Sequence, residues 1–172
     1  MKLLQASIIT IMFLLVACVK EDVPRNEGVS VGDPLPRFEV MLNNGKTVST
    51  ATLQGEVGVI IFFSTSCGDC QRELPNLETV YRYFEENGSV EMLAISREEN
   101  PENVERFWQE NELTIPYSVQ TDRRVYNLFA TVGVPRVYIT DKHNIIVSAF
   151  DDSDIPSPEQ LIEIIDEILQ NN

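Results

Sequence analysis

The sequence predicts an α/β fold with a mixed central sheet, helices on both faces of that sheet and an N-terminal β-hairpin. Two apolar runs, residues 57–63 and 90–95, are each followed by a segment with helical periodicity, which indicates buried strands that alternate with helices. Two further short strands, 136–140 and 145–150, precede a last amphipathic helix. Right-handed crossovers between successive units then place these strands in one sheet.

Residues 1–17 are predicted to be a signal peptide. A single positive charge at Lys2 precedes an apolar run from Ile8 to Val19, which is shorter than the roughly 20 residues of a membrane span. Leu15-Val16-Ala17-Cys18 resembles a bacterial lipobox, in which the cysteine is lipidated and becomes the mature N-terminus. The resemblance implies a lipoprotein of the cell envelope, anchored in a bacterial membrane and facing the periplasm or the cell surface. An ordinary cleaved signal or a buried Cys18 is the alternative.

The rest of the chain divides into a tether and one domain. Residues 18–32 are polar and without periodicity, so they are predicted to be the lipidated tether. Residues 33–172, about 140 in number, suffice for one compact domain with a sizeable core. The sequence carries 13 basic and 27 acidic residues, a net charge of −14, which argues against nucleic acid as a partner.

Turn residues mark the first elements of the domain. Asn43-Asn44-Gly45 separates residues 38–42 from 46–48 and predicts the turn of a β-hairpin. The buried run 57–63 leads into a helix with apolar positions every three or four residues, and Asn87-Gly88 ends that helix.

Capping residues mark the elements of the second half. Asn100-Pro101 provides an N-cap and a proline at N1 for another helix, and residues 115–119 are predicted to be extended. Ser157-Pro158-Glu159-Gln160 is a capping box for the last helix. Asp122 is predicted to cap a helix that carries Val125, Tyr126, Leu128 and Phe129.

Cys67 and Cys70 lie where the strand 57–63 gives way to a helix. The free N–H groups and the positive dipole end of a helix N-terminus favour a thiolate there, which is the geometry that a dithiol redox centre needs. A zinc site would require four ligands, and the chain offers only Cys18 and His143 besides this pair. Two unreactive core cysteines are the other alternative, and His143, in a predicted hairpin turn, is interpreted as a surface residue.

The arrangement resembles the thioredoxin superfamily. The resemblance rests on the strand, the CxxC pair, a helix with Pro75 and the later Gly133-Val134-Pro135. Cys70-Gln71-Arg72-Glu73-Leu74-Pro75 is similar to the TlpA/ResA branch of extracytoplasmic thiol-disulfide oxidoreductases. It implies a thioredoxin-like fold with an inserted helix and strand between residues 97 and 121. It also implies exchange with protein dithiols and disulfides, a membrane electron donor and no cofactor or metal.

Each site residue has a predicted role. Cys67, nearer the helix start, is the expected nucleophile, and Cys70 resolves the mixed disulfide. The resemblance assigns Glu73 to proton transfer near the dithiol, with a solvated first-turn carboxylate as the alternative. It also assigns Pro135 to the cis-proline that faces the CxxC pair, with a trans turn proline as the alternative. Asp69 places a negative charge between the two cysteines, which disfavours a thiolate and with it the reduced state, so a reductant is predicted. The helix dipole and Arg136 act in the opposite direction, and the sequence alone does not decide the balance.

The sequence departs from the thioredoxin pattern at three positions. Ser66 stands where a tryptophan commonly precedes the first cysteine, and Ile61 stands where thioredoxin has a buried acid. Arg136 follows the proline where relatives often carry threonine, and it either approaches the thiolate or points to solvent.

Two other functions fit a scaffold of this class. A thiol peroxidase of the peroxiredoxin type would require proline in place of Ile60 and threonine in place of Ser64. The other alternative is a redox-inert binding module or a copper carrier on the same scaffold. Copper carriers of this fold use a wider cysteine spacing and a histidine ligand, and His143 is badly placed for that role. The sequence favours a membrane-anchored oxidoreductase over both.

Overall fold

Five strands form the central sheet of the computed structural model, which describes residues 28–171. Their order is β5 (Tyr117–Ser118), β4 (Val90–Ser96), β3 (Val57–Phe63), β6 (Arg136–Thr140) and β7 (Ile146–Phe150). β3 pairs in parallel with β4 and antiparallel with β6, so the sheet is mixed, as predicted. The predicted signal peptide, Cys18 and most of the predicted tether lie outside the described residues.

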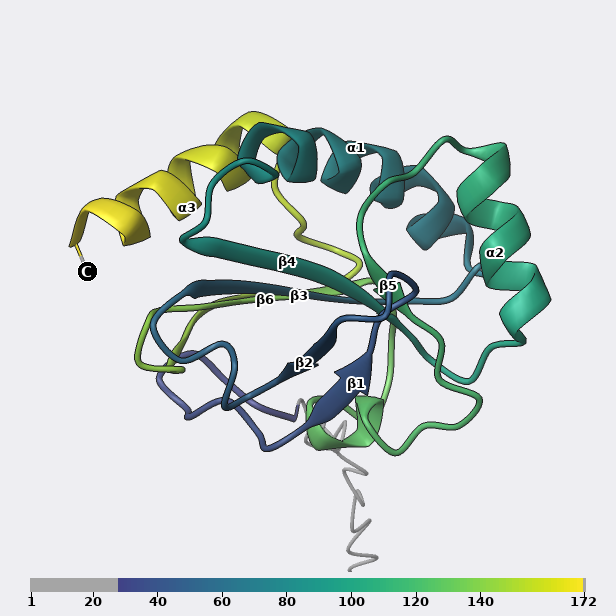
Figure 1. Ribbon diagram of the computed structural model, residues 1–172, viewed down its shortest axis with the longest axis horizontal. Coiled ribbons are helices and arrows are strands. Elements are labelled where there is room, and N and C mark those ends of the chain that lie inside the picture. The colour runs from purple at the N-terminus through teal and green to yellow at the C-terminus, as the bar shows by residue number, and fades with distance from the viewer. Residues whose placement is uncertain (1–27, 172) are drawn as a thin grey trace, which may run out of the picture.

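Different elements cover the two faces of the sheet. Figure 1 shows α1 (Gly68–Phe84) and α3 (Pro158–Asn171) packed together over one face. The predicted hairpin, β1 (Glu39–Met41) and β2 (Thr47–Ser49), is a separate two-stranded sheet below the other face, beside a 3-10 helix η1 (Tyr126–Leu128). The inserted helix α2 (Pro101–Glu110) lies at the end of the molecule where β5 is found.

The central strand β3 is buried along its whole length. It has a partner strand on each side, and the sheet is covered on both faces, so no residue of the strand meets water. This environment accounts for the unbroken apolar run Val-Gly-Val-Ile-Ile-Phe-Phe. The carboxyl end of this strand carries the chain to the two cysteines.

The prediction of a helix after Asp122 is wrong, because this segment forms only the single 3-10 turn η1. The Asp122 carboxylate accepts a hydrogen bond from the Arg124 N–H and pairs with the Arg124 guanidinium, so it caps no α-helix. Tyr126 and Phe129 both pack on Phe62 in the core. A 3-10 turn aligns residues three apart on one side, which satisfies this packing in fewer residues than an α-helix.

The predicted starts of α2 and α3 are confirmed. The Asn100 side chain accepts a hydrogen bond of 2.8 Å from the Glu102 N–H. At α3, the Gln160 N–H donates to Ser157 Oγ at 3.4 Å, and the Ser157 N–H donates to Gln160 Oε1 at 3.1 Å. This reciprocal pair is the capping box that the sequence indicates.

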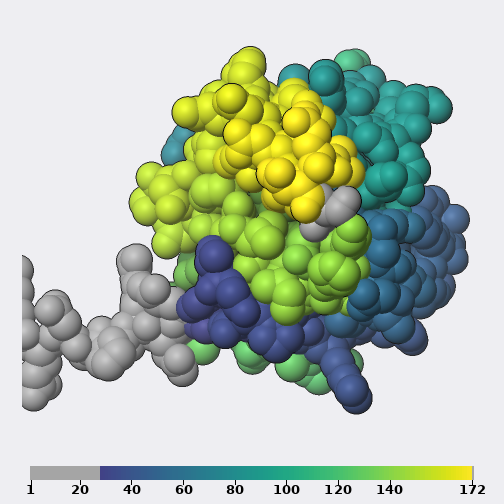
Figure 2. Space-filling model, turned by 90° about the vertical axis from the view of Figure 1, so that its left-hand side faces the viewer, coloured from purple at the N-terminus to yellow at the C-terminus, as the bar shows by residue number. Residues whose placement is uncertain are grey.

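The end of the molecule away from the start of α1 is formed by the C-terminal elements. Figure 2 shows α3 on the surface there, in yellow, above the yellow-green β6–β7 segment. Within residues 28–171, no helix is both long enough and apolar enough to span a bilayer.

Candidate active site

The two cysteines lie at the junction of β3 and α1. Cys67 is the N-cap of α1, with extended φ and ψ of −90° and 120°, and its carbonyl accepts the first helical hydrogen bond from Gln71 at 3.0 Å. Cys70 follows in the first turn and is completely buried, whereas Cys67 is half-buried. Both are free thiols. The predicted strand-to-helix position of the dithiol is confirmed.

Cys70 is held as a thiol by its surroundings. Burial raises the pKa of Cys70 well above its ordinary value, and the nearby Cys67 sulfur adds to this shift. The Ser64 N–H, which donates to Cys70 Sγ at 3.4 Å, and the positive charge of Arg97 oppose it. A buried, protonated sulfur behind a more accessible one is the arrangement expected of a resolving cysteine.

Cys67 faces the loop that precedes β6. Its Sγ–H donates to the Val134 carbonyl oxygen at 3.2 Å. The Val134–Pro135 peptide bond is cis, as the resemblance to thioredoxin predicts. The more accessible sulfur therefore lies against the backbone of the residue that precedes the cis-proline.

Glu99 is a site residue that the sequence reasoning missed. It follows β4, and its carboxylate accepts hydrogen bonds from Ser64 Oγ at 2.5 Å, from the Thr65 N–H at 2.8 Å and from Thr65 Oγ1 at 2.9 Å. Ser64 Oγ also lies 2.9 Å from Ser66 Oγ. Since the Ser64 hydroxyl proton goes to Glu99, Ser66 donates in this contact. A buried carboxylate thus holds Ser64 and Thr65 directly, and Ser66 through Ser64.

One signal in the sequence could have indicated Glu99. The carboxyl ends of parallel neighbouring strands meet at the same edge of a sheet, and Glu99 comes just after β4 as Ser64 comes just after β3. The hydroxyl and N–H groups of Ser64 and Thr65, which follow β3, require hydrogen-bond acceptors where they are removed from water.

The side chains of Glu73 and Arg136 form hydrogen bonds with groups other than the two sulfurs. Glu73 is half-buried on α1, and its carboxylate accepts a hydrogen bond of 3.2 Å from the Asn76 side chain. Arg136 is only 8% exposed, and its Nε donates to the Val132 carbonyl at 3.0 Å. Arg136 therefore does not point to solvent, and the positive charge of Arg97 lowers the pKa of Cys70. Asp69 forms an ion pair with Arg72.

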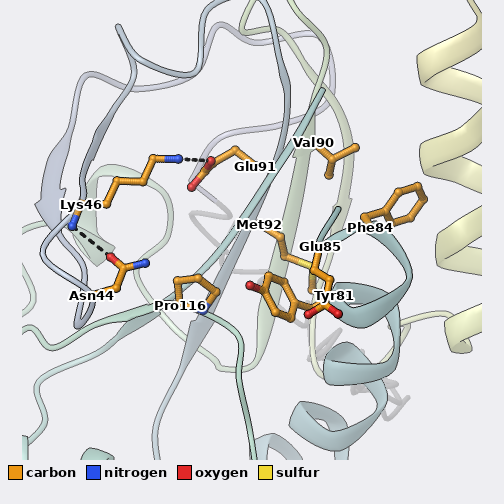
Figure 3. A pocket seen from close by; sticks show the side chains of 9 residues that line it. All are labelled: Asn44, Lys46, Tyr81, Phe84, Glu85, Val90, Glu91, Met92 and Pro116. Atoms are coloured by element: carbon orange, nitrogen blue, oxygen red, sulfur yellow. Dashed lines mark hydrogen bonds and ion pairs between the residues drawn. The ribbon is translucent and has the colours of Figure 1, made fainter. Parts of the chain in front are cut away.

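The remaining polar sites lie elsewhere. His143 is exposed in the β6–β7 turn, as predicted. A pocket of about 210 Å³ lies at the far end of α1. Figure 3 shows the ion pair of Lys46 and Glu91 on one side of this pocket and Tyr81 and Glu85 on another. Among residues 28–171 no three metal-binding side chains lie together.

A strand that ends in a CxxC dithiol at a helix N-terminus, facing a cis-proline loop, defines the class of thioredoxin-like thiol-disulfide oxidoreductases. Residues 31–149 match the AhpC/TSA family, and the chain belongs to that family. The thiol-disulfide oxidoreductase ResA of Bacillus subtilis is 26% identical over 121 residues, which are 70% of this chain and 67% of ResA.

Solved structures confirm the thioredoxin-like fold. One is the solution structure of a protein from Bacteroides thetaiotaomicron that is described as a protein disulfide isomerase. It has a TM-score of 0.77 and 26% sequence identity, and the match covers 84% of this chain and 94% of that chain. The crystal structure of StoA from Bacillus subtilis has a TM-score of 0.65 and 21% identity, with 77% and 97% covered.

Proposed function

We propose that this protein is a membrane-anchored thiol-disulfide oxidoreductase that reduces disulfides of proteins outside the cytoplasm. The observation that carries the proposal is the pairing of an accessible Cys67 with a buried Cys70 beside the backbone of Val134. The likeness to ResA supports the same class of chemistry. The partners are protein dithiols and disulfides, together with a dithiol donor in the membrane.

The reaction proceeds by two exchanges between sulfurs. The Cys67 thiolate attacks one sulfur of the substrate disulfide, the substrate S–S bond breaks, and its other sulfur leaves as a thiolate that takes up a proton. Cys70 then loses its proton and attacks Cys67 Sγ, which releases the second substrate thiol. The protein ends as the Cys67–Cys70 disulfide, and two electrons have passed to the substrate. A donor dithiol restores the reduced state by the reverse steps.

The environment of the dithiol supports reduction as the net direction. Strong oxidants of this class owe their potential to a stabilised reduced form. Here burial raises the pKa of Cys70, which disfavours its thiolate. This weakens the stabilisation of the reduced form and favours the donation of electrons, whereas the charge of Asp69 is offset by its ion pair with Arg72.

Equilibration with a glutathione redox buffer tests this direction. We expect a reduction potential nearer to about −270 mV, the value of thioredoxin, than to about −120 mV, the value of the oxidase DsbA. A potential near the oxidase end would identify a disulfide-forming protein instead. Turnover of peroxide by the purified protein without a second thiol protein would favour the peroxidase alternative.

The membrane anchor is proposed to be an acyl group on Cys18. Burial of acyl methylenes stabilises such an anchor by roughly 0.8 kcal/mol for each CH₂ group. We expect Cys18→Ser to shift the protein from the membrane to the soluble fraction or to leave it unprocessed, and to remove the lipid mass. Fractionation and intact mass equal to those of the parent protein would contradict the anchor.

A further inference from the structure

Four consecutive carbonyl oxygens in the loop before Pro135 each accept a hydrogen bond from a side chain. Arg123 Nη2 donates to Thr131 O at 2.9 Å, and Arg136 Nε donates to Val132 O at 3.0 Å. The Tyr126 hydroxyl donates to Gly133 O at 2.6 Å. The fourth donor is Cys67 itself, whose Sγ–H contacts Val134 O at 3.2 Å.

The first three donors are themselves held in place. Tyr126 is 1% exposed, and the guanidinium carbons of Arg97 and Arg123 each lie 5.3 Å from the centre of its ring. Cation–π contacts of this kind restrain both partners. Arg136 is buried beneath the same loop. We call Arg123, Tyr126 and Arg136 the carbonyl brace.

The fourth hydrogen bond differs from the other three. Two guanidinium groups and a phenol are strong donors that the reaction does not consume, whereas a thiol is a weak donor. Cys67 loses its S–H proton when it becomes a thiolate or joins a disulfide. Within residues 131–134, Val134 O is therefore the carbonyl whose partner departs during the reaction.

We propose that the carbonyl brace is a positioning device that fixes the register of the substrate at the active site. With the carbonyls of residues 131–133 held by the brace, Val134 O is left to accept a backbone N–H from an extended substrate segment beside its cysteine. This mode of pairing joins an extended segment to a main-chain acceptor, as in the addition of a strand. The inference rests on the proposed function, because it concerns the polypeptide that carries the substrate disulfide.

Tyr126→Phe tests the brace, since it removes the hydroxyl and keeps the ring between the two arginines. Rates are measured with two oxidised substrates, a peptide that contains a disulfide and dithiodipyridine, which has no peptide backbone. We expect the ratio of the peptide rate to the dithiodipyridine rate to fall about fivefold, which is the effect expected from the loss of one ordinary hydrogen bond. The loss should appear mainly in KM for the peptide, because the brace acts on binding geometry.

Arg123→Gln and Arg124→Gln provide a matched pair. Arg123 belongs to the brace, whereas its neighbour Arg124 is exposed and pairs with Asp122. Arg123→Gln should lower the same ratio, and Arg124→Gln should not. An unchanged ratio in both brace variants, or equal losses with the two substrates, would overturn the proposal. If the parent protein exchanged with neither disulfide, the proposed function itself would fail.

Discussion

Replacing Cys67 by serine is expected to reduce exchange with a peptide disulfide to the uncatalysed rate, a loss of about a thousandfold or more. Cys67 is the sulfur that meets the substrate, and nothing else within the described residues can attack in its place, because Cys70 is completely buried. The rate is measured by reduction of a peptide disulfide with the protein kept reduced by a dithiol.

The two single-cysteine variants also separate the roles of the sulfurs. In Cys67→Ser the remaining thiol is Cys70, whose pKa is raised by burial. A raised pKa means that this thiol stays protonated at neutral pH and becomes a thiolate only at strongly alkaline pH. Iodoacetamide should therefore label Cys67→Ser slowly at pH 7. It should label Cys70→Ser, in which Cys67 remains, roughly tenfold faster or more.

Cys70→Ser should in addition accumulate the substrate as a mixed disulfide on Cys67, since no second sulfur can release it. The trapped partner, identified after non-reducing separation, would name the substrate. Equal labelling of the two variants, or trapping on Cys67→Ser instead, would reverse the assignment of nucleophile and resolving cysteine.

The features that could be predicted from the sequence are those with a local signature. The apolar run of β3, the Asn100 cap and the CxxC spacing each depend on residues that are adjacent in the chain. The predictions drawn from these residues agree with the structure, because tertiary packing stabilises the same local conformation that the adjacent residues favour.

The features that escaped prediction depend on contacts between distant segments. Glu99 meets Ser64 across a separation of 35 residues, and neither residue indicates the other on its own. The turn η1 is short because Phe62, from β3, requires Tyr126 and Phe129 on one side. The position of Arg136 next to Pro135 does not indicate the direction of its side chain, which turns back to Val132 O.

Glu99→Ala is the second substitution for which we expect a large effect. It leaves Ser64 Oγ, the Thr65 N–H and Thr65 Oγ1 without their acceptor in a site that is buried at Ser64 and half-buried at Thr65. Hydrogen bonds to a charged group contribute about 1.5–3 kcal/mol each, and their sum is reduced by relaxation. We expect the free energy of unfolding to fall by about 3 kcal/mol, which corresponds to roughly 8 °C in Tm. Calorimetry and urea unfolding of the reduced protein measure the loss.

The same substitution should slow exchange by roughly tenfold to a hundredfold, because the segment Ser64–Ser66 positions Cys67. Glu99→Gln keeps the length of the side chain and should recover part of both losses. Glu98→Gln is the matched control, since Glu98 is exposed beside Glu99 and should behave as the parent protein. If Glu99→Ala left stability and rate unchanged, the carboxylate would have no part in holding the loop.

Glu73→Gln distinguishes the anchoring of the loop from proton transfer. Glu73 accepts a hydrogen bond only from Asn76 among the described residues, so its loss should cost little stability. If Glu73 exchanges protons with the dithiol, Glu73→Gln should shift the pH dependence of alkylation while Tm is retained. The Glu99 variants should instead lower Tm and the rate at every pH. Superimposable alkylation curves for Glu73→Gln and the parent protein would show that Glu73 is a surface charge that takes no part in proton exchange with the dithiol.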